Sequence, residues 1–250
     1  MTANVETKKS MRLSKTVALD YIAKQRWVIP LACILIYIAV YSVVFSDIFL
    51  SSYNISSLLL EFSIPSIIVI GMAIQLINGE IDLSVGYNVM FSNMCAGALI
   101  VLGVPVVGVI LITLAITSLF GFIIGTLVSR VGVNSFIASL GMGLFYYGMT
   151  QFIYSSIYST TLNNIDIQHL PAYFTSISKF ELLGIQLPVY YAAVLLILFS
   201  FMMAKLRYFR KYYFIGMNKE AAYLSGINVK SMKTMAFVFS ALFASIAGIL

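Results

Sequence analysis

Long apolar runs, broken by short polar stretches, make up most of this sequence. Several runs approach the roughly 20 residues that an α-helix needs to cross the hydrocarbon of a membrane. The runs do not alternate residue by residue, as the strands of a membrane barrel would. We therefore predict an all-α, polytopic helical membrane protein with about seven spans. The predicted bounds are 27–46, 57–77, 83–102, 105–128, 135–154, 188–204 and 234–250.

Two basic stretches flank these runs. Residues 1–26 form a polar, basic arm, and residues 205–233 form a loop in which Glu220 is the single acid among seven Lys and Arg residues. Lys and Arg beside membrane spans stay predominantly on the cytoplasmic side. We therefore expect a multi-pass protein of the cell membrane (plasma or inner), with its N-terminus and the 205–233 loop in the cytoplasm.

Composition supports this class and excludes several others. Hydrophobic residues make up 61% of the chain and charged residues 10%, whereas about a quarter of a soluble domain is charged. The net charge of +6 gathers beside the spans, so we attribute it to membrane orientation and predict no nucleic-acid partner. The sequence lacks GxxxxGK[ST], HExxH, GxSxG and a paired His/Cys ligand set, which are motifs of phosphate, metal and acyl chemistry. We expect no catalysis, no metal site and no bound cofactor.

A short helix is predicted within the 205–233 loop. Asn218 can cap its first turn, and Glu220 lies near the positive end of the helix dipole. Gly226 can end the helix in a left-handed conformation. Spacings of i, i+4 and i+7 predict an apolar stripe from residue 217 to residue 224, which we interpret as a docking face. The alternative is a basic helix that lies on anionic lipid.

Polar side chains recur at helical spacing within the predicted spans. Such groups should face the interior of the protein, where they either hydrogen-bond between helices or line a path for a polar, uncharged solute. Asp82 also has a simple structural explanation as the N-cap of the third span, and Glu80 has none. Gly121 and Gly125 form a GxxxG, which we interpret as a packing face. The candidate residues of the solute path are Gln75, Asn78, Glu80, Asp82, Ser84, Asn88, Ser92, Ser139 and Tyr147.

Three motifs, in order along the chain, carry a family resemblance. Residues 220–226, EAAYLSG, fit the EAA-xxx-G signature of the membrane subunits of ATP-binding-cassette (ABC) importers. EIDLSVG at 80–86 resembles the GIDLSVG motif of the ribose-type sugar permeases of that superfamily, and VNSFIASLGM at 133–142 resembles their NPFIATLG segment. Two positions depart from the pattern, because Glu80 stands where the family usually has glycine and Ser135 where it usually has proline.

The resemblance implies a permease subunit that moves a pentose, a hexose or a related furanoside. It implies a cytoplasmic ATPase partner that binds ATP and Mg²⁺, a second permease, identical or different, and an extracytoplasmic sugar-binding protein. Family members continue through further spans, so we expect this chain to be truncated. A secondary transporter or facilitator without an ATPase, or a membrane scaffold, is the alternative. The expected ATPase-coupling residues are Met217, Glu220, Ala221, Ala222, Leu224 and Gly226.

Overall fold

The computed structural model describes residues 28–158 and 179–250. The predicted N-terminal arm, the first residue of the predicted first span, and residues 159–178 of the loop before the sixth span lie outside the described residues. The chain divides into two compact units, Met1–Ser57 and Leu58–Leu250.

The described part of the first unit contains α2 (Val28–Val44), α3 (Ser46–Phe49) and the first turns of α4 (Ser52–Ile77). None of the residues of α2 is buried, as expected for an apolar helix whose side chains face lipid. Tyr41 holds the α2–α3 corner together, because its ring centroid lies 4.2 Å from that of Tyr37 and 5.7 Å from that of Phe49. The side-chain amide of Asn54 donates to the Phe49 carbonyl over 2.9 Å and so fixes the turn into α4.

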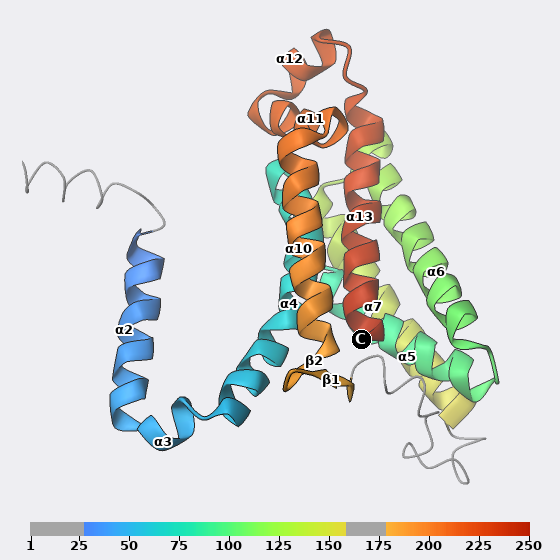
Figure 1. Cartoon of the computed structure of the whole chain (residues 1–250). Helices are drawn as coiled ribbons and strands as arrows, with labels where there is room; N and C mark the ends of the chain where they lie inside the picture. Colours follow the sequence, from blue (N-terminus) through green and yellow to red (C-terminus); the bar gives the residue numbers. More distant parts are fainter. Residues whose placement is uncertain (1–27, 159–178) are drawn as a thin grey trace, which may run out of the picture. The chain divides into compact units, whose positions relative to one another are not determined.

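The second unit is a bundle of helices (Figure 1). Its helix α13 packs against both α5 and α6. Among the described residues, 56% of the apolar stretch of α13 is buried, compared with 17–28% in the other four helices long enough to cross a membrane. The helix α13 is therefore the core of the bundle, and the others turn large apolar side chains outward. The bundle helices are α4, α5 (Val85–Val101), α6 (Val106–Thr126), α7 (Ser135–Ile153), α10 (Leu187–Lys205) and α13 (Val229–Ile249).

The prediction of an all-α polytopic protein is confirmed. Each predicted span overlaps one apolar helix. In the described residues five helices are long enough to cross a membrane, and α2 and α5 are shorter, at 17 residues each. Two π-helical turns extend α6 and α7, and a short hairpin that the sequence did not predict precedes α10. These elements are η1 (Leu127–Val131), η2 (Tyr154–Tyr158), β1 (Glu181–Leu182) and β2 (Ile185–Gln186).

Small residues allow α6 to approach α13 closely. A Cβ added at Gly125 would lie 2.7 Å from Thr234 Cα, and one at Gly121 would lie 2.7 Å from Ala241 Cβ. Both distances are shorter than ordinary van der Waals contact, so glycine is required at both positions. The packing role predicted for this GxxxG is confirmed.

Two helices begin five residues before the predicted bounds, and the other starts agree within two residues. The helix α4 begins at Ser52, five residues before the predicted second span. The helix α13 begins at Val229, because the Asn228 side chain caps it by accepting from the Ser231 amide over 3.0 Å. Lys230 and Lys233, which we predicted to lie in a loop, are therefore in the first two turns of α13. Apolarity alone placed this start too late, since the first turns of α13 are polar.

Two further helices lie at one end of the bundle, opposite the β1–β2 hairpin (Figure 1). They are α11 (Arg207–Met217) and α12 (Lys219–Leu224), which both lie within the predicted 205–233 loop. Phe209, Tyr212 and Ile215 form the buried face of α11 and join a core that also contains Phe199 of α10. A Cβ at position 216 would collide with the Ile77 carbonyl oxygen, so glycine there lets α11 rest on the end of α4.

Candidate functional site

The helix α12 has its own start and stop signals. The Asn218 side chain accepts hydrogen bonds from the Glu220 and Ala221 amides, each over 3.0 Å. Gly226 follows the helix with a φ of +78°, and the Ile227 amide donates back to the Ala222 carbonyl over 3.1 Å. This bonding satisfies the end of a helix that closes on a left-handed residue. The caps predicted at both ends are confirmed.

The surface of α12 is unusually apolar for an exposed helix. Tyr223 and Leu224 are 71% and 84% exposed, and Met217 at the end of α11 is 85% exposed. Ala222 is buried and holds α12 against the bundle. The predicted stripe through Met217, Ala221 and Leu224 is wrong as a single helical face. Met217 does not belong to the same helix as Ala221 and Leu224, because the extended backbone of Asn218 (φ −157°) separates it from α12.

Clefts lie on both sides of α12. One, of ≈1080 Å³, separates α12 from the adjacent ends of η1 and α13, and its lining includes Lys219, Glu220, Lys230 and Lys233. The other, of ≈570 Å³, separates α12 from α11 and carries Arg207, Arg210 and Lys211 together with Phe214 and Met217. The exposed Tyr223 and Leu224 of α12 line the first of these basic clefts, and Met217 of α11 lines the second.

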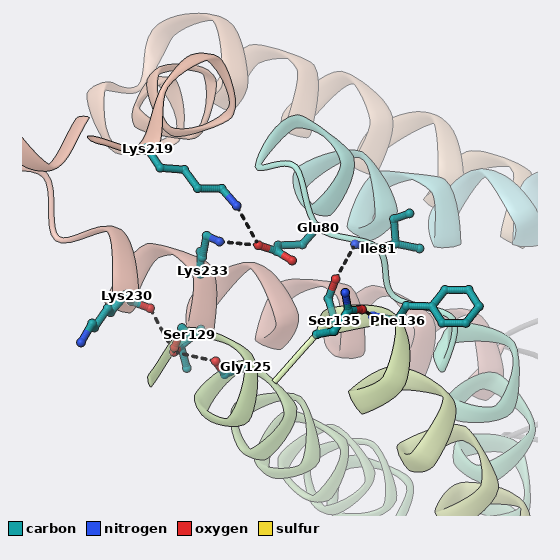
Figure 2. Close-up of polar contacts among 11 residues, drawn as sticks. Glu80, Ile81, Gly125, Ser129, Ser135, Phe136, Lys219, Lys230 and Lys233 are labelled. Atoms are coloured by element: carbon teal, nitrogen blue, oxygen red, sulfur yellow. Dashed lines mark hydrogen bonds and ion pairs between the residues drawn. The ribbon is translucent and has the colours of Figure 1, made fainter. Parts of the chain in front are cut away.

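The segment 78–84, between α4 and α5, lies next to α12. Its Glu80 carboxylate forms an ion pair with Lys233 of α13 and a second, at 3.4 Å, with Lys219 of α12 (Figure 2). Burial raises the pKa of Glu80, but hydrogen bonds from Lys233 and Ser135 and the charges of both lysines outweigh burial, so the pKa lies below its ordinary value. Glu80 is therefore ionised at neutral pH. It is the predicted candidate that had no structural explanation, and the structure supplies one.

Asp82, in the same segment, is buried and binds neighbours on two elements. Its Oδ1 accepts from the Ser84 amide over 2.9 Å and from the Ser84 hydroxyl over 2.6 Å, and its Oδ2 accepts from Ser240 of α13 over 2.8 Å. The prediction that Asp82 is the N-cap of this span is wrong, because α5 begins at Val85 and Ser84 is its N-cap. The carboxylate instead ties the start of α5 to α13.

Most of the other predicted path residues lie inside the bundle. Asn88 donates to the Ala241 carbonyl over 3.0 Å and accepts from Ser92 over 3.1 Å. Ser139 is fully buried and donates to the Phe136 carbonyl of its own helix over 3.2 Å. These contacts favour helix packing, which was one of the two interpretations of the polar faces.

Gln75, Asn78 and Tyr147 differ from that pattern. Both side-chain amides are fully buried, and neither has a hydrogen-bond partner among the described residues. Tyr147 is 47% exposed, and its ring centroid lies 6.5 Å from that of Tyr87. The predicted path residues thus divide between the interior and one exposed ring, and they do not line a common cavity among the described pockets.

Sequence reasoning missed several residues of this site. Lys219 and Lys233 counted only as part of a basic flank, yet both bind Glu80. Thr234 and Ser240 of α13 were not singled out, although they bind Ser129 and Asp82. The two residues are six positions apart, which places them roughly 120° apart around α13, so they form no common polar face that the sequence could have marked.

The sequence matches, over residues 54–250, the protein family described as the permease component of the branched-chain amino acid transport system. That range covers most of the chain, including the 78–84 segment and α12. The chain belongs to this permease family. The family comprises membrane transport components, so this permease is a transporter subunit and not an enzyme.

Similar proteins carry sugar-transport names. The ribose import permease protein of Haemophilus influenzae is 30% identical over 92% of this chain and 69% of its own length. The D-allose transport system permease protein of Escherichia coli is 27% identical over 86% of this chain and 64% of its own length. The galactose/methyl galactoside import permease protein of Escherichia coli is 28% identical over 83% of this chain and 66% of its own length. The chain thus spans about two thirds of the length of these relatives. No solved structure matches it.

Family membership and apolar helices together make this permease a multi-pass membrane protein. Within residues 28–158 and 179–250, no three His, Cys, Asp or Glu side chains lie together in a way that could hold a metal ion.

Proposed function

We propose that this permease is the membrane subunit of an ABC importer that carries a sugar into the cell, driven by a separate ATPase that docks on α12. The three relatives described above are named for ribose, allose and galactose transport, so a monosaccharide is the substrate class. The observation that carries the proposal is the capped helix α12, which exposes Tyr223 and Leu224 at one end of the bundle.

The charges around α12 support a cytoplasmic position. The loop that contains α11 and α12 is rich in Lys and Arg, and such loops remain on the cytoplasmic side of the membrane. The same rule supports a cytoplasmic N-terminus, because residues 1–26 are also basic. An ATPase that uses cytoplasmic ATP would meet α12 there.

The apolar side chains of α12 support a protein partner. Exposed apolar side chains that gather beside polar and charged groups are typical of a protein interaction surface. Met217, Tyr223 and Leu224 are each more than two thirds exposed and stand beside basic clefts. A partner with an apolar groove and an acidic rim would complement this surface. The proposed coupling residues are then Met217, Glu220, Ala221, Ala222, Leu224 and Gly226.

Further partners follow from an importer of this kind. We propose that a second permease, identical or different, completes the translocation path and that an extracytoplasmic binding protein delivers the sugar. ATP and Mg²⁺ would bind to the ATPase and not to this chain. Among the buried path residues, Gln75 and Asn78 have side-chain amides that no other described residue binds, so we propose these two as contacts for the solute.

The test compares two exposed leucines at opposite ends of the second unit. Leu224 on α12 is 84% exposed and Leu183 in the β1–β2 turn is 91% exposed. Leu224→Asp should abolish co-purification of the ATPase and lower uptake of labelled ribose, allose or galactose at least tenfold, since a central apolar contact contributes that much to binding. Leu183→Asp should leave both unchanged. Equal behaviour of the two variants would contradict docking at α12.

A further inference from the structure

The segment 78–84 is bonded to helices that are distant in sequence. It connects α4 to α5, and its side chains and backbone bind α7, α12 and α13 (Figure 2). The bonded pairs are Glu80 with Lys219, Glu80 with Lys233, the Ile81 amide with the Ser135 hydroxyl, and Asp82 with Ser240. A displacement of this segment therefore reaches the start of α5 and the core helix α13 together.

The two lysines at Glu80 differ in their exposure to water. The Lys233 side chain is 12% exposed and the Lys219 side chain 52% exposed, while the Glu80 side chain is 10% exposed. Water and salt screen the half-exposed pair strongly and the enclosed pair weakly. The Lys233 contact is therefore the permanent one, and the Lys219 contact, at 3.4 Å, is the one that can open and close.

The helix α12 has few other attachments to the bundle. Within this fully described helix, Ala222 is the one buried residue, and the caps at both ends are formed within the loop itself. Lys219 is the first residue of α12, so it moves with the helix. Its ion pair is consequently a direct connection from α12 to the segment that begins α5.

The connection continues into the bundle. Asp82 accepts from Ser84, the N-cap of α5, and from Ser240 on α13. One turn further along α5, Asn88 donates to the Ala241 carbonyl of α13. The short backbone from Glu80 to Asp82, followed by these hydrogen bonds, thus links the position of Glu80 to the contact between α5 and α13.

We propose that Glu80 is a positioning residue for transport: through Lys233 it holds the segment 78–84 on α13, and through Lys219 it transfers displacements of α12 to that segment and to α5. This inference rests on the proposed function, in which a partner displaces α12. Glu80 contacts neither ATP nor sugar in this scheme. Its carboxylate connects α12, through Lys219, with α13, through Lys233.

The first experiment removes each lysine in turn. Lys219→Met eliminates the half-exposed pair, and Lys230→Met is the matched control, since Lys230 lines the same cleft and has the same charge. In membranes that contain the complete transporter, we expect Lys219→Met to lower sugar uptake per ATP hydrolysed about two- to fivefold, the range of an exposed ion pair, with ATPase co-purification retained. Lys230→Met should retain the wild-type ratio of sugar uptake to ATP hydrolysis, because Lys230 does not bind Glu80. Equal loss in both variants would overturn the proposal in favour of general surface charge.

A second pair of variants separates positioning from folding. Glu80→Gln leaves Lys233 enclosed without a counter-charge, so it should lower the melting temperature as well as uptake. The double variant Glu80→Gln/Lys233→Met removes the unpaired charge and should recover the melting temperature. If Glu80 is a positioning residue, uptake per ATP stays low in the double variant. Recovery of uptake together with stability would show a purely structural role and overturn the proposal.

A readout on the purified permease distinguishes this inference from the proposed function. Amide hydrogen exchange should accelerate in residues 78–84 and 219–224 of Lys219→Met and stay at the wild-type rate in Lys230→Met. Unchanged exchange in both variants would refute the connection, whatever the transported substrate. A wild-type protein that neither co-purifies with an ATPase nor takes up sugar would refute the proposed function, while the exchange data would still report on the connection.

Discussion

The contact between α6 and α13 gives the sharpest test of the bundle, through Gly125→Ala. The added Cβ would lie 2.7 Å from both the Cα and the carbonyl oxygen of Thr234. Ordinary contact begins at 3.4 Å, so the two backbones would have to separate by about 0.7 Å (3.4 minus 2.7). Both atoms belong to the backbone of the core helix, which cannot rotate away as a side chain could. Overpacking of this kind costs about 1–3 kcal/mol.

The same substitution elsewhere supplies the control. Gly141 lies within α7, and a Cβ there would meet nothing within 4 Å. Alanine stabilises a helix by roughly 0.5–1 kcal/mol relative to glycine, and both variants gain this amount. The difference between Gly125→Ala and Gly141→Ala therefore isolates the cost of separating α6 from α13, about 1–3 kcal/mol in unfolding free energy.

The assay is unfolding of the purified protein in mild detergent, followed by circular dichroism during titration with a denaturing detergent. Gly125→Ala should unfold at a lower denaturant concentration than wild type, and Gly141→Ala at the same or a higher one. The hydrogen bond from Thr234 to the Gly125 carbonyl, 3.3 Å long, should weaken with the separation. If the two variants unfold together, α6 and α13 are not in close contact and the reasoning fails.

Three further predictions concern the 78–84 segment and α12. Ser240→Ala removes a donor to the buried Asp82 carboxylate and should cost about 1.5–3 kcal/mol in unfolding free energy; Ser118→Ala, whose hydroxyl binds its own helix, should cost less. The pKa of Glu80 is lowered, so its stabilisation is full above the ordinary glutamate pKa and is lost as pH falls through the lowered value; the melting difference between wild type and Glu80→Gln should shrink below about pH 4. Gly226→Ala forces a side chain to φ +78° and should cost about 1–2 kcal/mol, measurable as faster amide exchange in α12.

The elements of the fold follow from local sequence, and their partners do not. Apolar runs predicted the membrane helices, and the residue types of Asn218 and Gly226 predicted both ends of α12, because capping depends on neighbours a few residues away. The early start of α13 was missed because its first turns are polar and carry Lys230 and Lys233. A hydropathy pattern marks where hydrocarbon begins, which differs from where a helix begins.

The candidate site was predictable in part. Glu80 stood out as a carboxylate without an explanation, but its lysines lie 139 and 153 residues further along the chain. The segment around Glu80 has two acids and no base, so charge could not assign it to a side of the membrane, since its counter-charges come from α12 and α13. Helical spacing placed Asn88 and Ser92 on one face, but it did not show that α13 covers that face.

The central position of α13 has a consequence for biosynthesis. The helices α5 and α6 leave the ribosome well before α13, yet their polar and glycine-bearing faces find their partners on it. Until α13 is inserted, the amide of Asn88 lacks the Ala241 carbonyl and the Asp82 carboxylate lacks the Ser240 hydroxyl. Because unsatisfied polar groups are costly in hydrocarbon, α5 and α6 are less stable in lipid without α13. Assembly of the bundle is therefore favoured once α13 has been inserted beside α5 and α6.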